Sequence, residues 1–211
     1  MALLPLSRRA QSASIWLLYV VGLAPAVWTF YLGATGGLGA DPVKTFERFL
    51  GLWALRFLIL TLVITPLRDL AGWNGLRYRR ALGLLTFYYV LMHFSVYLIL
   101  DQRLDLQTVM ADILRRPFIT VGMACLLLLI PLAVTSNAFS IRRLGSRWTT
   151  LHKLIYPIAA GAAFHYYLSQ KVTTVEQFIY LAIVVILLAY RLLRPTLMAR
   201  RRQRRQAGSL R

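Results

Sequence analysis

The chain has 211 residues, of which 58% are hydrophobic and only 15% are charged, and its formal net charge is +18. A soluble domain is roughly 45–50% apolar and about 25% charged, so these values exclude an ordinary soluble fold. They also exclude a nucleic-acid-binding protein, which would not be so apolar. A membrane protein with basic residues in its cytoplasmic connections accounts for both the hydrophobicity and the charge.

Six apolar stretches follow one another along the chain, each close to the 17–25 residues, roughly, that a membrane-spanning helix needs. They cover residues 15–32, 49–66, 81–100, 118–135, 149–168 and 178–193. Pro25 in the first stretch and Pro157 in the fifth predict local kinks. We therefore expect an all-α, polytopic membrane protein, with a six-helix domain over residues 15–193 between an N-terminal segment, 1–14, and a basic tail, 194–211.

The distribution of charge between the connections predicts the orientation. The N-terminal segment, the second and fourth connections and the tail hold most of the basic residues: Arg8, Arg9, Arg68, Arg77, Arg79, Arg80, Arg142, Arg143, Arg147, Lys153, Arg194, Arg200, Arg201, Arg202, Arg204, Arg205 and Arg211. The other three connections hold few basic residues and six of the seven acids: Asp41, Glu47, Asp101, Asp105, Asp112 and Glu176. Basic connections stay in the cytoplasm, so we expect both termini there.

The three histidines of the chain all fall in predicted spans, where an ionisable residue is a functional-site hypothesis. His93 lies 13 residues after Arg80, or about 20 Å along a helix, and is therefore in the outer half of the third span. His165 lies near the outer end of the fifth span. Two imidazoles at similar depths on two helices have the geometry needed to hold one haem iron. The alternative for each histidine is an interhelical hydrogen bond.

His152 lies 13 residues before His165, about 20 Å deeper and about 140° away around an ideal helix. A second cofactor at this inner level is compatible with the spacing but is not required by it. Arg79 stands about where a facing ligand would lie; arginine is a poor iron ligand, but it suits a haem propionate or a flavin phosphate. The other basic residues around this level are Arg77, Arg80, Arg147 and Lys153.

Arg56 lies near the middle of the second span, where burying a charge costs at least about 2.5–3.5 kcal/mol on insertion scales. Two interpretations stay open. Arg56 faces the interior of the bundle and meets a propionate, or its side chain extends to the membrane surface. The single cysteine, Cys125, excludes an intrachain disulfide and the attachment motif of a c-type haem, and it is read as a small core residue.

Two segments carry a resemblance that covers the whole chain. They are RRALGL at 79–84, which leads to His93, and WTTLHKLIY at 148–156, which leads to His165. The layout resembles the ferric-reductase-like transmembrane superfamily and, more closely, the MsrQ (YedZ) family, the haem-bearing membrane subunits of a bacterial methionine sulfoxide reductase system. The superfamily pattern has two histidines on each of two helices, and this sequence has Arg79 where the fourth would stand.

The resemblance implies one or two b-type haems in a bacterial inner membrane, with His93 and His165 as ligands and His152 as an inner ligand. It also implies FMN in some members. Electrons would come from a cytosolic flavin reductase or from the quinone pool. They would pass to MsrP, a periplasmic molybdopterin enzyme that repairs oxidised methionine. The chain would then be an electron-transfer subunit rather than a complete enzyme.

Two alternatives stay open from the sequence. The first is a stand-alone ferric or quinol oxidoreductase of the same superfamily. The second belongs to another class, a small proton-coupled transporter whose histidines relay protons.

Overall fold

The computed structural model of the chain describes residues 7–170, 172 and 174–208, and the side chains of these residues except Arg8 and 200–208. Residues 1–6 of the predicted N-terminal segment and 209–211 of the basic tail lie outside the described residues. In the described part, every regular element is a helix, so the predicted all-α fold is confirmed. The elements are α1 (Arg8–Ala34), α2 (Pro42–Ala71), α3 (Leu76–Ser95), η1 (Val96–Asp101), α4 (Leu106–Arg115), α5 (Pro117–Val134), α6 (Ala138–Leu144), α7 (Ser146–Leu151), η2 (His152–Leu154), α8 (Ile155–Leu168) and α9 (Val175–Gly208).

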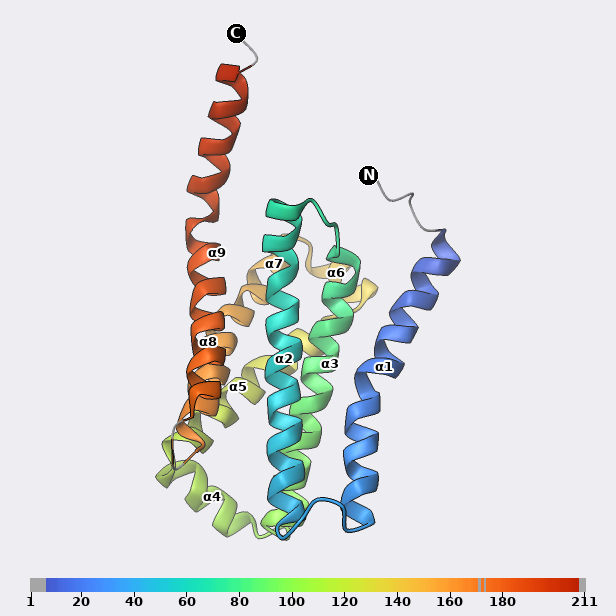
Figure 1. Ribbon diagram of the computed structural model, residues 1–211, viewed down its shortest axis with the longest axis vertical. Coiled ribbons are helices and arrows are strands. Elements are labelled where there is room, and N and C mark those ends of the chain that lie inside the picture. Colours follow the sequence, from blue (N-terminus) through green and yellow to red (C-terminus); the bar gives the residue numbers. More distant parts are fainter. Residues whose placement is uncertain (1–6, 171, 173, 209–211) are drawn as a thin grey trace.

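The long helices form a bundle with two distinct ends (Figure 1). The connection between α1 and α2 and the short helix α4 lie at the bottom of the view, which we call the α4 end. The short helix α6, the start of α1 and the end of α9 lie toward the opposite end, which we call the α6 end. The start of α1 and the end of α9 are therefore on the same side of the bundle.

Five helices are long and apolar enough to cross a membrane: Arg9–Ala34, Pro42–Ala71, Leu76–Asp101, Pro117–Val134 and Val175–Ala199. Each contains, or nearly contains, one predicted apolar stretch, and the helices mostly extend beyond it because their ends are fixed by polar and turn residues. At the start of α2, the Asp41 side chain accepts a hydrogen bond from the Lys44 backbone N–H, and Pro42 occupies the first turn. At its end, Gly72 has a φ of 73°, the left-handed conformation that stops a helix.

The fifth predicted stretch, 149–168, forms a divided helix. It consists of α7, the 3₁₀ turn η2 and then α8. Pro157 lies in the first turn of α8, where its missing N–H leaves the carbonyl of Lys153 without the usual helical donor. The chain therefore tightens at His152–Leu154 before the α-helix starts again. A sixth crossing stays a prediction.

Helix α2 is central to the packing. One face lies in a buried cluster with α5, α8 and α9, whose members include Leu62, Leu129, Ala159 and Val184. Another face lies in a second cluster with α1 and α3, whose members are Ala26, Leu50, Ala54, Phe57, Ile64, Leu82, Leu85, Tyr89 and Val96. Large apolar side chains on the outside of α1 and α9 are exposed, such as Trp16 and Leu192, as expected for surfaces that face lipid.

Candidate cofactor site

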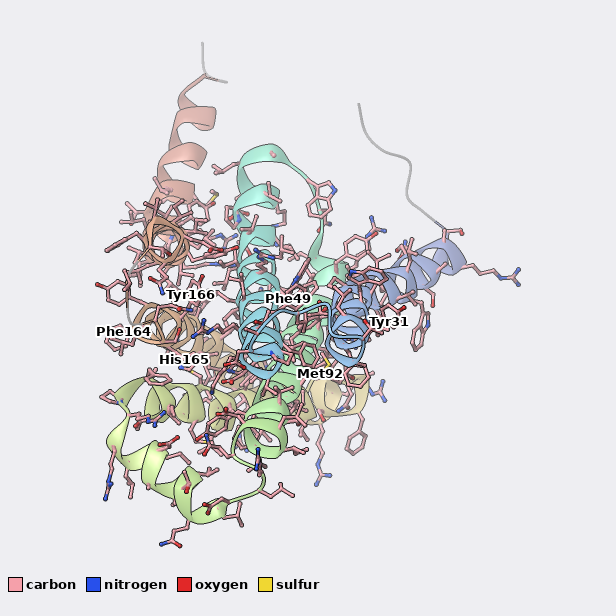
Figure 2. All side chains as sticks on the ribbon, turned by 60° about the horizontal axis from the view of Figure 1, so that its bottom comes forward. Tyr31, Phe49, Met92, Phe164, His165 and Tyr166 are labelled. Atoms are coloured by element: carbon pink, nitrogen blue, oxygen red, sulfur yellow. The ribbon has the colours of Figure 1, made fainter. Side chains whose placement is uncertain are left out.

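The His93 and His165 side chains face each other across the interior of the bundle. His93 is in the last turn of α3 and His165 in the last turn of α8, and their ring centres are 6.2 Å apart at an interplanar angle of 79°. Figure 2 shows Phe164 directed away from the bundle, whereas its neighbour His165 points inward. The structure thus brings together the two histidines that the sequence placed at similar depths.

Each imidazole is held from behind by a backbone carbonyl of a neighbouring helix. The Nδ1 of His93 lies 2.8 Å from the carbonyl oxygen of Glu47 on α2, and the Nδ1 of His165 lies 2.6 Å from that of Phe118 on α5. A carbonyl can only accept, so each Nδ1 carries the proton and donates it. This fixes the tautomer and leaves each Nε2 lone pair free for a ligand bond.

A glycine lies four residues after each of these carbonyls. In a helix, the carbonyl of residue i accepts from the N–H of residue i+4, so a side chain at i+4 would cover the approach to that oxygen. A Cβ on Gly51 would lie 3.2 Å from His93 ring atoms, and a Cβ on Gly122 would lie 2.8 Å from His165 ring atoms. The same device, a carbonyl followed by glycine one turn later, therefore positions both rings.

The two histidines line a cavity of about 370 Å³ between α2, α3, α5 and α8. This volume lies within the range of cofactor and ligand pockets, about 300–1,000 Å³. Its walls are mainly apolar, with contributions from Leu55, Leu58, Val90, Leu126, Leu129 and Ile158. Apolar walls with two convergent nitrogen ligands suit a flat, mainly apolar macrocycle.

The ring separation also suits such a group. A metal–imidazole bond is about 2 Å long. If two imidazoles bind one metal ion from opposite sides, the two bonds plus the distance from each nitrogen to its ring centre separate the ring centres by about 6 Å. The separation in the structure is 6.2 Å. His93 and His165 would then hold the iron of a haem through their Nε2 atoms. In the part of the chain that the structure describes, no group of three or more His, Cys, Asp or Glu side chains is arranged to hold a metal ion.

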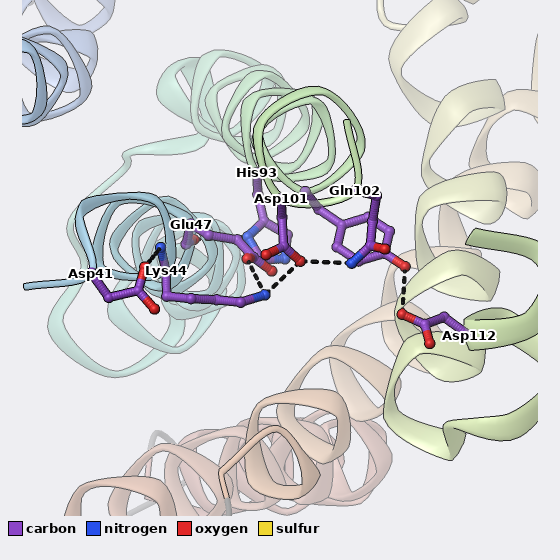
Figure 3. Close-up of polar contacts among 8 residues, drawn as sticks. Asp41, Lys44, Glu47, His93, Asp101, Gln102 and Asp112 are labelled. Carbon is purple, nitrogen blue, oxygen red and sulfur yellow. Dashed lines mark hydrogen bonds and ion pairs between the residues drawn. The ribbon is translucent and has the colours of Figure 1, made fainter. Parts of the chain in front are cut away.

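Three basic residues line the cavity toward the α4 end: Lys44, Arg48 and Arg116. Lys44 lies between two carboxylates, 3.2 Å from Glu47 and 2.6 Å from Asp101 (Figure 3). Arg116 pairs with Asp112 at 3.0 Å. Arg48 makes no hydrogen bond or ion pair with any residue that the structure describes, so its guanidinium is the basic group most available to an anionic ligand.

Arg48 is not among the candidate site residues that the sequence predicts. A signal was nevertheless present, because Arg48 shares a helix face with Gly51, Leu52 and Leu55, all of which line the cavity. The two carbonyls and the two glycines carried no such signal.

His152 is separate from this cavity and is not among the residues that line it. Its ring stacks on Trp148 at 3.8 Å, its Nδ1 lies 3.0 Å from the Trp148 carbonyl oxygen, and its Nε2 lies 3.5 Å from the Ser136 hydroxyl. Arg79 is close enough to interact electrostatically with His152. The structure therefore places one imidazole and one arginine together toward the α6 end.

The other basic residues predicted around the inner level are exposed: Arg77, Arg80, Arg147 and Lys153. Arg77 lies over the Tyr78 ring at 5.2 Å. Arg56 does not line the cavity. Its Nε donates a 2.8 Å hydrogen bond to the Tyr180 hydroxyl of α9, and its guanidinium lies over the Trp53 ring at 5.2 Å. The partner of this mid-span arginine is thus a tyrosine of the bundle.

Comparison with known proteins places this geometry in context. Residues 50–163 match the family model described as "Ferric reductase like transmembrane component". Proteins of Brucella ovis, Brucella canis and Brucella suis are each 63% identical over 194 residues, covering 92% of this chain and 88% of theirs. Each bears the name "Protein-methionine-sulfoxide reductase heme-binding subunit MsrQ". No solved structure matches the chain.

Proposed function

This chain belongs to the ferric-reductase-like transmembrane family and, within it, to the MsrQ haem-binding subunits, and we propose that it is the electron-transfer subunit of a methionine sulfoxide reductase system. The observation that carries the proposal is the pair of opposed imidazoles, His93 and His165, with ring centres 6.2 Å apart in an apolar cavity. When bound there, haem b supplies reversible one-electron chemistry.

The residues of the cavity have distinct roles in this proposal. His93 and His165 would hold the haem iron through Nε2, and the carbonyls of Glu47 and Phe118 orient the rings and increase the basicity of each Nε2. The apolar walls exclude water from the iron. Arg48 would bind a propionate, since a guanidinium recognises a carboxylate through two parallel hydrogen bonds, and Arg116 and Lys44 would complete a basic rim.

At the α6 end, we propose that His152 and Arg79 serve a second cofactor, either a second haem or FMN. His152 would supply one ligand nitrogen, and Arg79 would bind a propionate or a phosphate. The helical rise places His152 about 20 Å from His165 along the bundle. Two cofactors at these levels would divide the crossing of the membrane into shorter electron transfers. Arg77, Arg80, Arg147 and Lys153 would make the surface around the inner level attractive to an anionic group.

The proposed topology has six crossings, with both termini in the cytoplasm of a bacterial cell. It is supported by the basic connections at the α6 end and by the start of α1 and the end of α9 lying on one side of the bundle (Figure 1). In this topology the divided helix α7–η2–α8 is the sixth crossing. Residues 15–193 then form the transmembrane domain, flanked by the segment 1–14 and the basic tail 194–211. The α4 end faces the periplasm.

The proposed direction of electron flow is from the cytoplasmic side to the periplasmic side. Donors would be a cytosolic flavin reductase or the quinone pool, and the acceptor would be the periplasmic molybdopterin enzyme MsrP. Asp41, Asp101 and Asp105 lie at the α4 end and would contribute to docking by charge complementarity.

A visible spectrum of the detergent-purified protein tests the proposal. We expect the reduced-minus-oxidised difference bands of a low-spin b-type haem with two nitrogen ligands. Absence of these bands from protein that is folded and expressed with adequate haem supply would refute the proposal and favour the proton-coupled transporter. Bands combined with rapid reduction of ferric iron in the absence of MsrP would favour the stand-alone oxidoreductase.

A further inference from the structure

The short helix α4 presents an exposed apolar stripe to its surroundings. Leu106, Met110 and Leu114 follow one another at intervals of four residues, so they lie on one face of the helix. Their side chains are 65%, 56% and 80% exposed, respectively. The polar residues Thr108 and Arg115 lie on another face and are also exposed. The helix is thus strongly amphipathic, and its apolar side has no protein partner in the described residues.

The opposite side of α4 is firmly attached to the bundle, so the stripe cannot rotate inward. Val109 and Asp112 are buried. The Asp112 carboxylate accepts a 3.1 Å hydrogen bond from the Tyr97 hydroxyl of η1 and pairs with Arg116 at 3.0 Å. The Thr120 hydroxyl of α5 donates to the Ile113 carbonyl. The orientation of the stripe is therefore a fixed feature of the fold.

The backbone before α4 is shaped to lay the helix across the end of the bundle (Figure 1). Arg103 and Leu104 have φ values of 51° and 64°, in the left-handed region that bulky L residues rarely adopt. Asp105 then caps the first turn by accepting from the backbone N–H groups of Gln107 and Thr108. Two consecutive residues in this conformation reverse the chain, so that α4 does not continue the direction of η1.

The exposed apolar surface continues from a membrane-spanning helix into α4. Ile99 and Leu100, which close the candidate span Leu76–Asp101, are 51% and 49% exposed, and Leu104 is 59% exposed. Along the chain, lipid-facing side chains therefore lead directly to the stripe of α4. Amphipathic helices with this pattern lie in the plane of the membrane interface, with the apolar face in the acyl region and the polar face among the headgroups.

We propose that α4 is an interfacial helix that inserts Leu106, Met110 and Leu114 into the outer leaflet of the membrane. Its assignment to the outer leaflet rests on the proposed topology. Arg116 directly follows α4 and lines the cavity, so this anchor holds the basic rim of the cavity at the level of the lipid headgroups. An incoming redox partner then meets the cofactor site at a fixed height above the bilayer.

Spin-label accessibility tests the proposal with matched positions on the same helix. Single cysteines would be placed by Met110→Cys and Leu114→Cys on the apolar stripe and by Arg115→Cys on the polar side. The background variant would be Cys125→Ala, accepted after its haem content is shown to equal that of the wild type. The labelled full-length proteins would be reconstituted into vesicles of phosphatidylcholine and phosphatidylglycerol.

At positions 110 and 114, we expect the label to collide several times more often with oxygen, which concentrates in lipid, than with a water-soluble nickel chelate. At position 115, we expect the reverse order. High nickel accessibility at positions 110 and 114 would overturn the proposal and leave the stripe as a surface for a protein partner.

A separate measurement isolates the dependence on topology. An impermeant maleimide should label Arg115→Cys in intact spheroplasts. Labelling only after lysis would overturn the outer-leaflet assignment and the proposed topology together, whereas the accessibility pattern at positions 110 and 114 would still decide whether α4 is interfacial.

Discussion

The imidazoles of His93 and His165, on helices α3 and α8, face each other with ring centres 6.2 Å apart. Each is oriented by a carbonyl of a different helix, Glu47 on α2 and Phe118 on α5. Four helices therefore converge on one pair of nitrogen atoms. The positions of both Nε2 atoms depend on helix packing as well as on the histidines themselves, and this dependence makes the site testable at several levels.

The first prediction concerns the ligands. His93→Ala and His165→Ala should each lower the haem content of this cavity and abolish the spectrum of a haem with two nitrogen ligands, because only one of the two ligand nitrogens remains. His152→Ala should leave this haem in place and affect only a cofactor at the α6 end. Haem content per protein and the reduced-minus-oxidised spectrum are the measurements. Full haem content in His93→Ala or His165→Ala would contradict the assignment.

The second prediction concerns the two glycines. Gly122→Ala would place a Cβ 2.8 Å from His165 ring atoms, and Gly51→Ala would place one 3.2 Å from those of His93. Overpacking of this kind costs about 1–3 kcal/mol. If this cost reduces the free energy of haem binding, the affinity for haem falls roughly 5–150-fold. Gly122→Ala should have the larger effect. Titration of the haem-free protein with haem would measure it.

A matched control is available in the same chain. Gly83 is also within a helix, but a Cβ there would have no neighbour within 4 Å. Gly83→Ala should therefore leave haem affinity unchanged and favour the helix slightly. Equal losses in all three variants would show that the glycines act on general stability and not through the histidine rings.

The positions of the helices can largely be predicted from the sequence, because membrane spans follow from the length of apolar runs. The ends of the helices were less accessible. Asp41 and Gly72 extend and then stop α2 well outside its apolar stretch, and these local signals act independently of hydropathy. Pro157 did signal an irregularity, but the resulting 3₁₀ turn at His152–Leu154 depends on how the chain packs.

The candidate site can be predicted from the sequence only in part. Depth along a helix is a local quantity, so counting residues placed His93 and His165 at similar levels. The carbonyls that orient the rings lie 46 and 47 residues away in the chain, and nothing in a backbone carbonyl marks it in a sequence. Arg56 shows the same limit, because its partner Tyr180 is 124 residues away. Its mid-span position predicted a need for a partner without identifying one.

The third prediction concerns Arg48. A cation next to the haem favours the reduced form, which carries one positive charge less. Arg48→Gln should therefore lower the midpoint potential while haem stays bound, by about 60 mV if the effect is tenfold in the one-electron equilibrium. Potentiometric titration measures the change. Arg115→Gln, an exposed residue at the same end of the bundle, should leave the potential unchanged, and an equal shift there would contradict a specific role for Arg48.

The fourth prediction concerns pH and the cap of α4. The pKa of Asp105 is held below its ordinary value by hydrogen bonds. The bond from the Thr108 hydroxyl has the largest effect, and the bond from the Thr108 backbone N–H has the next largest. Because this pKa is lowered, the stabilisation of the first turn by the ionised carboxylate is fully present above about pH 4, the usual aspartate pKa. It is lost as the pH falls through the lower pKa of the folded state.

Hydrogen exchange at the first turn of α4 would measure this loss. Acidification toward pH 3 should increase the opening of the Gln107 and Thr108 amides, after correction for the intrinsic exchange rate. Asp105→Asn keeps a neutral cap and should remove most of the pH dependence, whereas Asp105→Ala should open the turn at all pH values. Pronounced pH dependence in the asparagine variant would contradict the role of Asp105.

The last prediction concerns a pairing between α2 and α9 that compensates for a proline. Pro66 lies four residues after Leu62 and has no N–H, so the Leu62 carbonyl lacks its helical donor. The Arg191 guanidinium donates to this carbonyl at 2.9 Å. Arg191→Gln should leave the carbonyl unsatisfied and reduce the free energy of unfolding by about 1–3 kcal/mol.

A double-mutant cycle with Pro66 tests this explanation. In a Pro66→Ala background, the new N–H at position 66 bonds to the Leu62 carbonyl, so Arg191→Gln should reduce the free energy of unfolding by less. Equilibrium unfolding of the four proteins in mixed micelles gives the coupling energy, which should lie within about 0.5–3 kcal/mol. As a control, Arg143→Gln changes an exposed arginine of α6, and its effect on the free energy of unfolding should add to that of Pro66→Ala. If the effects of Arg191→Gln and Pro66→Ala were also additive, the Leu62 carbonyl would have to be satisfied in another way.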